Sequence, residues 1–213
     1  MSEAKNTHSH PLIALTFDDG PNTTITMQIL DLLEQYHLKA SFFLIGNHIS
    51  DATVPVILRA RQLGCEINNH SVSHPDMSVL DREGILAEVT PVTERITSLL
   101  GEPPRFFRPP FISTSELMYE TIDLPFICGI GCEDWVPDVS AEARISMLQE
   151  HVCDGAILLL HDFEGNQNTV AALQTLLPEW LEAGYEFVTV SELFRKKGVT
   201  PSLHENVTYS VVG

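Results

Sequence analysis

The chain has 213 residues, of which 44% are hydrophobic and 19% are charged. This length is enough for one domain with a full hydrophobic core, and the composition excludes wholesale disorder. Twelve Lys and Arg stand against 29 Asp and Glu, which gives a formal net charge of −17. Nucleic acids and anionic membrane surfaces bind to positively charged patches, so we expect neither of them as a partner.

No apolar run approaches the roughly 18 residues that a membrane-spanning helix needs. Residues 1–10 are polar and lack the apolar centre of a secretion signal. We therefore expect a cytoplasmic protein as the chain stands, or a secreted or cell-wall enzyme if the chain is an excised domain. The four cysteines, Cys65, Cys128, Cys132 and Cys153, have no Cys-x-x-Cys spacing, so we expect small buried side chains in a reducing compartment.

Short apolar strands alternate with amphipathic helices along the whole chain. Strands are expected at 12–17, 40–46, 65–70, 105–108, 126–130, 156–160 and 187–190. Helices are expected at about 24–36, 51–64, 81–100, 141–151, 170–184 and 191–197. Pro91 lies inside the third of these helices and is expected to kink or split it.

Around seven β-α units predict a parallel sheet within a single α/β domain. Strand count and length favour a small or incomplete barrel, but periodicity alone leaves open whether the sheet closes. We expect a short N-terminal arm at 1–11, a catalytic domain at 12–197 and a C-terminal arm at 198–213.

The first strand runs directly into two adjacent carboxylates, Asp18 and Asp19, followed by a Gly20-Pro21 break. Neighbouring side chains on a strand point to opposite faces, so the two acids should aim in different directions. Taken alone, this pair is most simply a solvated Asp-Asp-Gly turn. The alternative is a site in which a metal ion or a cation compensates the crowded acids.

His70 and His74 follow another expected strand and are four residues apart. On one helical turn or in a compact loop, both imidazoles can meet one metal ion, although this spacing alone is a weak signal. With one strand-end Asp they form a three-ligand set that leaves a position open for water. Such a set is typical of catalytic zinc sites.

Three more polar groups follow expected strands: Arg108 before Pro109-Pro110, Asp134 beside Trp135, and His161. Each has a plain structural interpretation as a surface arginine, a loop whose Trp packs on the core, or a structural histidine. In the functional interpretation, Arg108 pairs with whichever Asp does not bind the metal. Five strand ends with compatible chemistry are more specific than any one of them, because parallel α/β proteins place their active sites there.

The ordered segments resemble the five motifs of the polysaccharide deacetylases, the NodB-homology domains of carbohydrate esterase family four. They are Thr16-Phe17-Asp18-Asp19-Gly20-Pro21, His70-Ser71-x-x-His74, Arg108-Pro109-Pro110, Asp134-Trp135 and Leu159-x-His161. The likeness spans roughly residues 12–197. It implies a distorted (β/α)7-type barrel and a metal-dependent hydrolase that removes acetyl groups from an acetylated carbohydrate.

The resemblance also implies roles for the first group of residues. Asp19, His70 and His74 would bind one divalent metal ion, commonly zinc, with cobalt and nickel as alternatives. Asp18 would be the general base that takes a proton from the attacking water. Arg108 would orient this base and keep it ionised.

Five further residues have implied roles around the leaving group and the acetyl group. His161 would be the general acid, with Asp134 favouring its charged form. The backbone N–H of Phe111 would complete the oxyanion hole. Trp135 and Leu159 would form the walls of the pocket for the acetyl methyl group.

Many relatives have Tyr-Gly after the two prolines, whereas this chain has Phe111-Ile112. The motifs specify acetyl removal but leave the sugar open. N-acetylglucosamine units of peptidoglycan or chitin-like chains are slightly favoured, with O-acetylated xylan close behind. Two alternatives are a metal-dependent amidohydrolase of small molecules on the same fold and a non-catalytic carbohydrate-binding barrel. The retention of every expected ligand, base and acid argues against the second of these.

Overall fold

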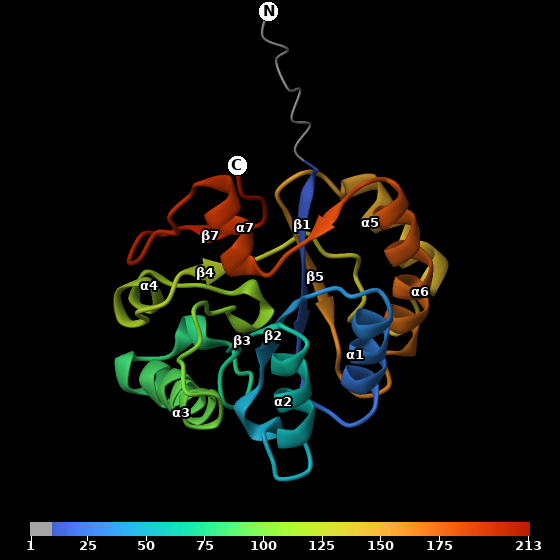
Figure 1. The fold of residues 1–213 in the computed structure, drawn as a ribbon. Helices are drawn as coiled ribbons and strands as arrows, with labels where there is room; N and C mark the ends of the chain where they lie inside the picture. Colours follow the sequence, from blue (N-terminus) through green and yellow to red (C-terminus); the bar gives the residue numbers. More distant parts are fainter. Residues whose placement is uncertain (1–9) are drawn as a thin grey trace, which may run out of the picture.

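The computed structural model describes residues 10–213, which contain a parallel sheet built around one central strand, β1 (Figure 1). The strands are β1 (Leu12–Asp18), β2 (Ser41–Leu44), β3 (Glu66–Asn69), β4 (Phe126–Ile127), β5 (Ala156–His161), β6 (Glu186–Phe187) and β7 (Thr208–Tyr209). β1 pairs with β5, β6 and β2, and β2 pairs with β3, always in parallel. The carboxyl ends of β1, β2, β3 and β5 therefore lie at one end of the sheet.

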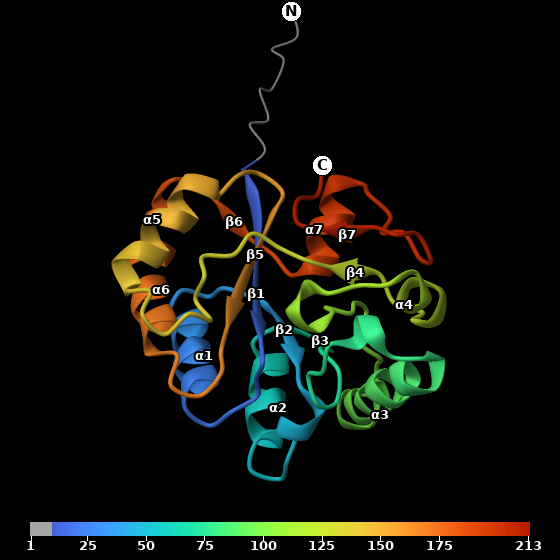
Figure 2. The ribbon, with the colours of Figure 1, turned by 180° about the vertical axis from the view of Figure 1, so that it is seen from behind.

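Isolated bridges extend this sheet into a distorted barrel. Asn69 at the end of β3 bridges Phe107, and Phe107 bridges Phe126 in β4. Ile130, just after β4, bridges Leu158 in β5, which brings the ring back to its start. Figure 2 shows β5 beside β1 from behind. One side of the barrel is thus held by single bridges and the other by full ladders.

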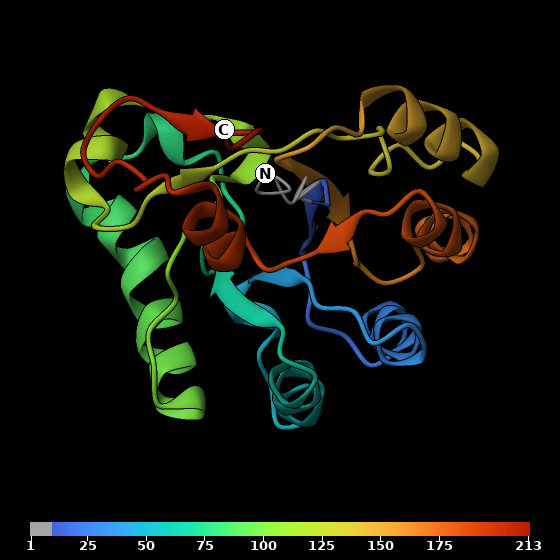
Figure 3. The same ribbon diagram turned by 45° about the horizontal axis from the view of Figure 1, so that its top comes forward.

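Helices cover the outside of the strands (Figure 3). They are α1 (Ile25–Gln35), α2 (Val54–Gln62), α3 (Arg82–Leu100), α4 (Glu116–Thr121), α5 (Ala141–His151), α6 (Gln167–Glu182) and α7 (Val190–Lys197). Short 3-10 turns lie at η1 (Gly46–His48), η2 (Met77–Val79) and η3 (Pro110–Ile112). Within residues 10–213, no helix combines the length and the apolar character that crossing a membrane requires.

The two faces of β1 pack into two separate hydrophobic cores. Ile13, Leu15 and Phe17 belong to the core between the sheet and the outer helices, whereas Leu12 and Ala14 belong to the core inside the barrel. This alternation is the two-residue period of a strand, and it directs the last side chain of β1, Asp18, toward the barrel interior.

The expected split of the third helix at Pro91 is wrong, because α3 continues through this residue. Proline removes one hydrogen bond to the carbonyl four residues earlier, here that of Ala87. Both Pro91 and Ala87 are exposed, so water can satisfy that carbonyl.

The strand expected at 105–108 is reduced to the bridge at Phe107. The side-chain oxygen of Asn68 accepts the backbone N–H groups of Arg105 and Phe106, each at 3.1 Å. These donors are therefore satisfied by a side chain and not by a ladder, which the local sequence did not indicate.

The helix expected from Asp51 begins three residues later, at Val54, because the chain first makes a turn in which the Thr53 hydroxyl donates to the His48 carbonyl at 2.6 Å. Among the cysteines, Cys65 and Cys132 are buried as expected. Cys128 is only half-buried and Cys153 is exposed, so the expectation fails for these two.

Residues 198–213, which we expected to be an arm, return to the barrel. β7 pairs with β4, and Val211 bridges Ala156 at the start of β5. Val212 is buried in the interior core, where its apolar side chain holds the segment in place. Residues 1–9 lie outside the described range, so the N-terminal arm stays a prediction for them.

Candidate active site

The predicted catalytic and metal-binding side chains lie at the carboxyl end of the parallel strands. Asp18 ends β1 and lies in register with His161, the last residue of β5. His70 directly follows β3. Arg108 comes one residue after the Phe107 bridge, and Asp134 lies in the loop after β4. Segments far apart in the sequence thus deliver their polar groups to one end of the barrel.

Asp19, His70 and His74 form a cluster whose ligand atoms all lie within 4.8 Å of one another. The Nε2 atoms of His70 and His74 lie 3.5 and 3.6 Å from Asp19 Oδ1. Asp19 Oδ1 is buried and has no hydrogen-bond partner among the described residues. A buried carboxylate oxygen that faces two imidazole nitrogens without a donor fits a divalent metal ion.

The protonation of the cluster also suits metal binding. His70 Nδ1 lies 2.7 Å from the Arg108 carbonyl, which can only accept, so Nδ1 carries the proton and Nε2 has a free lone pair. Burial raises the pKa of Asp19, but His70, His161 and His74 outweigh it and hold that pKa below its usual range. Burial and the neighbouring His70 lower the pKa of His74. Both changes favour the deprotonated forms that bind metals.

The loop that carries the two histidines has an unusual backbone. Ser71 and His74 in this loop have φ values of 68° and 58°, and Asp19, in the loop after β1, has a φ of 74°. Non-glycine residues rarely adopt this left-handed region, and such strain is concentrated at functional sites. The carboxylate of Glu88 in α3 holds the loop by accepting the backbone N–H groups of Val72 and Ser73 at 2.9 and 2.8 Å.

Asp18 and Arg108 form a buried ion pair. Their side chains are 2% and 0% exposed, and Arg108 Nη1 donates to Asp18 Oδ1 at 2.6 Å. A second guanidinium nitrogen donates to the Cys128 carbonyl, and Arg108 Cζ lies 4.2 Å from the centre of the Phe43 ring. These contacts fix the position of the guanidinium, which in turn orients the Asp18 carboxylate.

His161 and Asp134 form the second pair. His161 Nδ1 donates to Asp134 Oδ1 at 2.8 Å, and the backbone N–H of His161 donates to Asp134 Oδ2 at 2.7 Å. Burial lowers the pKa of His161, but the hydrogen bond and charge of Asp134, with the charges of Asp18 and Asp19, raise it to about 9. His161 is therefore charged at neutral pH and has a proton to give.

Exposed aromatic side chains lie on the rim of the site. Phe111 is 68% exposed, and its ring centre lies 4.6 Å from that of His74. Trp135 is 50% exposed, and its ring centre lies 5.6 Å from that of His161. Trp135 and the buried Leu159 both approach Gly131, where an added Cβ would lie 3.2 and 3.6 Å from them. Trp135 and Leu159 thus both lie beside Gly131, and their role in an acetyl pocket stays a prediction.

Comparison with known proteins gives the family. Residues 5–123 match the family model described as polysaccharide deacetylase. A bifunctional xylanase/deacetylase of Pseudobutyrivibrio xylanivorans is 45% identical over 206 residues, which cover 97% of this chain and 33% of that protein. A peptidoglycan-N-acetylglucosamine deacetylase of Bacillus cereus is 34% identical, with 89% of this chain and 91% of that protein covered. The chain belongs to the polysaccharide deacetylase family.

Two solved structures confirm the fold class. The Xyl-CE4 domain of a multidomain xylanase from the hindgut metagenome of Trinervitermes trinervoides has a TM-score of 0.92 and 42% identity, covering 95% of this chain and 98% of that chain. A family 4 acetyl xylan esterase from Clostridium thermocellum, in complex with a cobalt ion, has a TM-score of 0.91 and 38% identity, covering 94% and 98%. The family resemblance of the motifs is likewise confirmed. This chain spans about a third of the xylanase/deacetylase and 42% of a peptidoglycan deacetylase of Listeria monocytogenes.

Asp162 is a buried carboxyl group that we did not identify from the sequence. The Thr26 hydroxyl donates to its Oδ2 at 2.5 Å, and its backbone N–H donates to the Asp18 carbonyl at 2.9 Å. A Cβ added at Gly20 would lie 2.8 Å from Asp162 Oδ1, so only glycine fits this turn. Burial and the charges of Asp19 and Asp18 raise the pKa of Asp162 to about 7, although the hydrogen bond from Thr26 lowers it. Its position directly after His161 was the only available signal.

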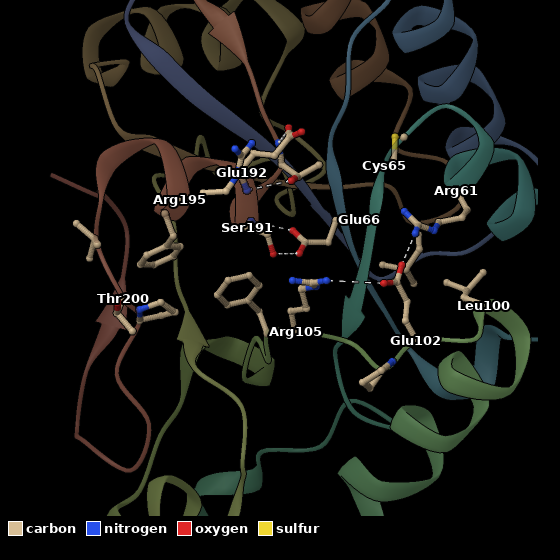
Figure 4. A pocket seen from close by; sticks show the side chains of 18 residues that line it. Arg61, Cys65, Glu66, Leu100, Glu102, Arg105, Ser191, Glu192, Arg195 and Thr200 are labelled. Atoms are coloured by element: carbon tan, nitrogen blue, oxygen red, sulfur yellow. Dashed lines mark hydrogen bonds and ion pairs between the residues drawn. The ribbon is translucent and has the colours of Figure 1, made fainter.

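A large cavity of this chain lies elsewhere (Figure 4). It has a volume of about 760 Å³ and is lined by residues that include Glu66 at the amino end of β3, Arg105, Ser191 and Glu192. None of the predicted site residues lines it. The candidate active site is therefore identified by its chemistry and not by the size of a cavity.

Proposed function

We propose that this chain is a metal-dependent hydrolase that removes acetyl groups from carbohydrate. The observation that carries this proposal is the meeting of three groups at one end of the barrel. These are the Asp19, His70 and His74 cluster, the buried Asp18–Arg108 pair and the His161–Asp134 pair. Together they supply a metal site, a base and a charged acid.

Asp19, His70 and His74 would hold one divalent ion, for which we propose zinc. When bound, such an ion lowers the pKa of a coordinated water toward about 7 and polarises a carbonyl group. The free Nε2 of His70 and the unpartnered Oδ1 of Asp19 are the donor atoms that support this assignment.

The other side chains move and stabilise the protons and charges. Asp18 takes a proton from the attacking water, and Arg108 holds the Asp18 carboxylate in position through its hydrogen bond to Oδ1. His161 gives its proton to the departing sugar oxygen or nitrogen, and Asp134 keeps His161 charged until then. The backbone N–H of Phe111 is the proposed donor to the developing oxyanion.

For the substrate, we place O-acetylated xylan before polymers of N-acetylglucosamine. The support is similarity to proteins named for xylan chemistry, at 45%, 42% and 38% identity, against 34% for the peptidoglycan deacetylase of Bacillus cereus. This order reverses the slight preference for amide substrates that the motifs alone suggested. The second candidate keeps the support of the Bacillus cereus relative, which aligns over 91% of its own length.

The test is acetate release by the metal-stripped protein after reloading with zinc or cobalt. Acetylated xylo-oligosaccharides, chitooligosaccharides and peptidoglycan fragments are compared at equal acetyl concentration. We expect release that depends on metal, is fastest on xylo-oligosaccharides and is lost in Asp18→Asn. If none of the three substrates released acetate, the non-catalytic barrel or an amidohydrolase of small molecules would replace this proposal.

A further inference from the structure

Arg144 in α5 is a buried arginine behind the catalytic pair, and its side chain is 2% exposed. All of its hydrogen bonds go to neutral oxygens, those of Val136, Val139, Asn166 and Thr169. A buried charge without a direct counter-ion reduces stability, so its presence calls for another explanation.

The guanidinium can only donate hydrogen bonds, and this fixes the direction of the bonds beyond it. Arg144 Nη1 donates to Thr169 Oγ1 at 2.8 Å and to Asn166 Oδ1 at 2.6 Å. The Thr169 hydroxyl, which accepts from Arg144, gives its own hydrogen to Asp134 Oδ2 at 2.9 Å. The Asn166 amide turns its oxygen to Arg144 and therefore its NH2 group to the His161 carbonyl at 2.9 Å and Asp134 Oδ2 at 3.4 Å.

Asp134 is consequently surrounded by donors. Its Oδ2 accepts from Thr169, from Asn166 and from the backbone N–H of His161. Its Oδ1 accepts from His161 Nδ1 at 2.8 Å. An oxygen that must accept requires a hydrogen on Nδ1, so the exchangeable proton of the imidazolium is the one on Nε2.

We propose that Arg144 is a positioning residue, which acts through Thr169 and Asn166 to keep Asp134 an acceptor and His161 in the Nδ1–H form. This inference rests on the proposed role of His161 as the general acid. Without the guanidinium, the Thr169 hydroxyl can rotate and the Asn166 amide can flip, so that the directions of their hydrogen bonds are no longer fixed. Asp134 would then lose two of its fixed donors, and the orientation of the His161 ring would be less strictly set.

The experiment compares matched pairs of variants in the zinc-loaded protein. Thr169→Val removes the hydroxyl at nearly constant volume, and Thr169→Ser keeps it. Arg144→Met removes the donors, and Arg144→Lys keeps a donor and the charge. The ring nitrogens of His161 are observed by 15N NMR, and kcat and KM are measured for acetate release. Ser191→Ala removes a hydroxyl at the opposite end of the barrel and is the control.

Because His161 is charged at neutral pH, its ring is observed above a pH of about 9, where it is neutral. In the wild-type protein we expect this neutral ring to be entirely in the Nδ1–H form. Thr169→Val and Arg144→Met should show a mixture of both tautomers and a kcat about tenfold to a hundredfold lower, with KM nearly unchanged. Thr169→Ser and Ser191→Ala should behave like the wild type. Arg144→Lys should show a smaller tautomer change and a smaller loss of kcat than Arg144→Met.

A single tautomer and an unchanged kcat in Thr169→Val and Arg144→Met would overturn the proposal. If Arg144→Met does not fold, the Thr169→Val and Thr169→Ser pair decides alone. The NMR result does not depend on turnover. A tautomer change without any acetate release by the wild type would therefore contradict the proposed function and leave the hydrogen-bond assignment standing.

Discussion

The two ends of the barrel carry the same kinds of charged side chains but use them differently. At the end with the large cavity, Glu66 accepts from Ser191 and Arg61 pairs with Glu102 (Figure 4). Glu66 also accepts from Ser41, and Lys39 pairs with Glu192. At the carboxyl end, Asp19 Oδ1 is buried without a donor, and several residues have left-handed backbones. A buried carboxylate oxygen without a donor thus distinguishes the functional end, whereas a large cavity distinguishes the other end.

The contrast has a physical basis. A charged group that is paired on the surface gains little and binds nothing further, because its partner already satisfies it. A buried carboxylate oxygen without a donor reduces stability unless a ligand arrives to satisfy it. At the catalytic end, Asp19 Oδ1 therefore needs a cation to satisfy it. The carboxylates at the opposite end already have partners.

The largest expected effect comes from removing the Asp19 carboxylate. Asp19→Ala should lose the bound metal and lower kcat/KM by at least about a thousandfold, since metal ions stabilise the transition state by several kcal/mol. Glu66→Gln changes a carboxylate at the opposite end and should leave both quantities unchanged. Metal content and acetate release measure the two effects. A wild-type metal content in Asp19→Ala would show that Asp19 is not a ligand.

The next effect concerns stability. Arg108→Met leaves the buried Asp18 without its partner, and breaking a buried pair in this way costs about 3–5 kcal/mol. Urea unfolding of the metal-free protein measures this loss without interference from bound metal. The double variant Arg108→Met with Asp18→Asn should regain part of the stability, because it removes the uncompensated charge. No recovery in the double variant would mean that packing of Arg108 on Phe43 is the main contribution.

The third effect is a shift in pH dependence. His161 must be protonated to act as an acid, and with its pKa raised to about 9 the rate should fall as the pH rises through that value. In Asp134→Asn the raising charge is gone while burial remains, so the alkaline limb of kcat should move down by at least about one pH unit. Glu192→Gln at the opposite end should not move it. A limb that stays in place in Asp134→Asn would assign it to a different group.

Much of the site was predictable because its motifs are local. The adjacent Asp18 and Asp19, the spacing of His70 and His74 and the single His161 each follow a strand, and parallel strands deliver their ends to one place. The supporting residues were not predictable in this way. Glu88, for example, lies in a helix more than ten residues after the histidine loop that it contacts. No fixed sequence spacing between Glu88 and the histidines indicates this contact.

Contacts across the fold explain the other differences. Arg144 and Asp134 are linked only through Thr169 and Asn166, so no pattern in the sequence joins them. Asn68 replaces a strand ladder with its side chain, and an isolated asparagine gives no sign of doing so. The overall barrel follows from periodicity, whereas such polar contacts depend on a tertiary structure that periodicity does not describe.

The smallest effect is expected at the end with the large cavity. Arg61 and Glu102 form an exposed pair, and the loss of such a pair in Arg61→Met should change the free energy of unfolding by about 0–1 kcal/mol. The rate of acetate release should not change, because no residue of the candidate site lines this cavity. Urea unfolding and acetate assays at low and high salt give the comparison, since salt screens an exposed pair but hardly a buried one. A loss as large as that in Arg108→Met would show that the two ends of the barrel do not differ in the way their charges are used.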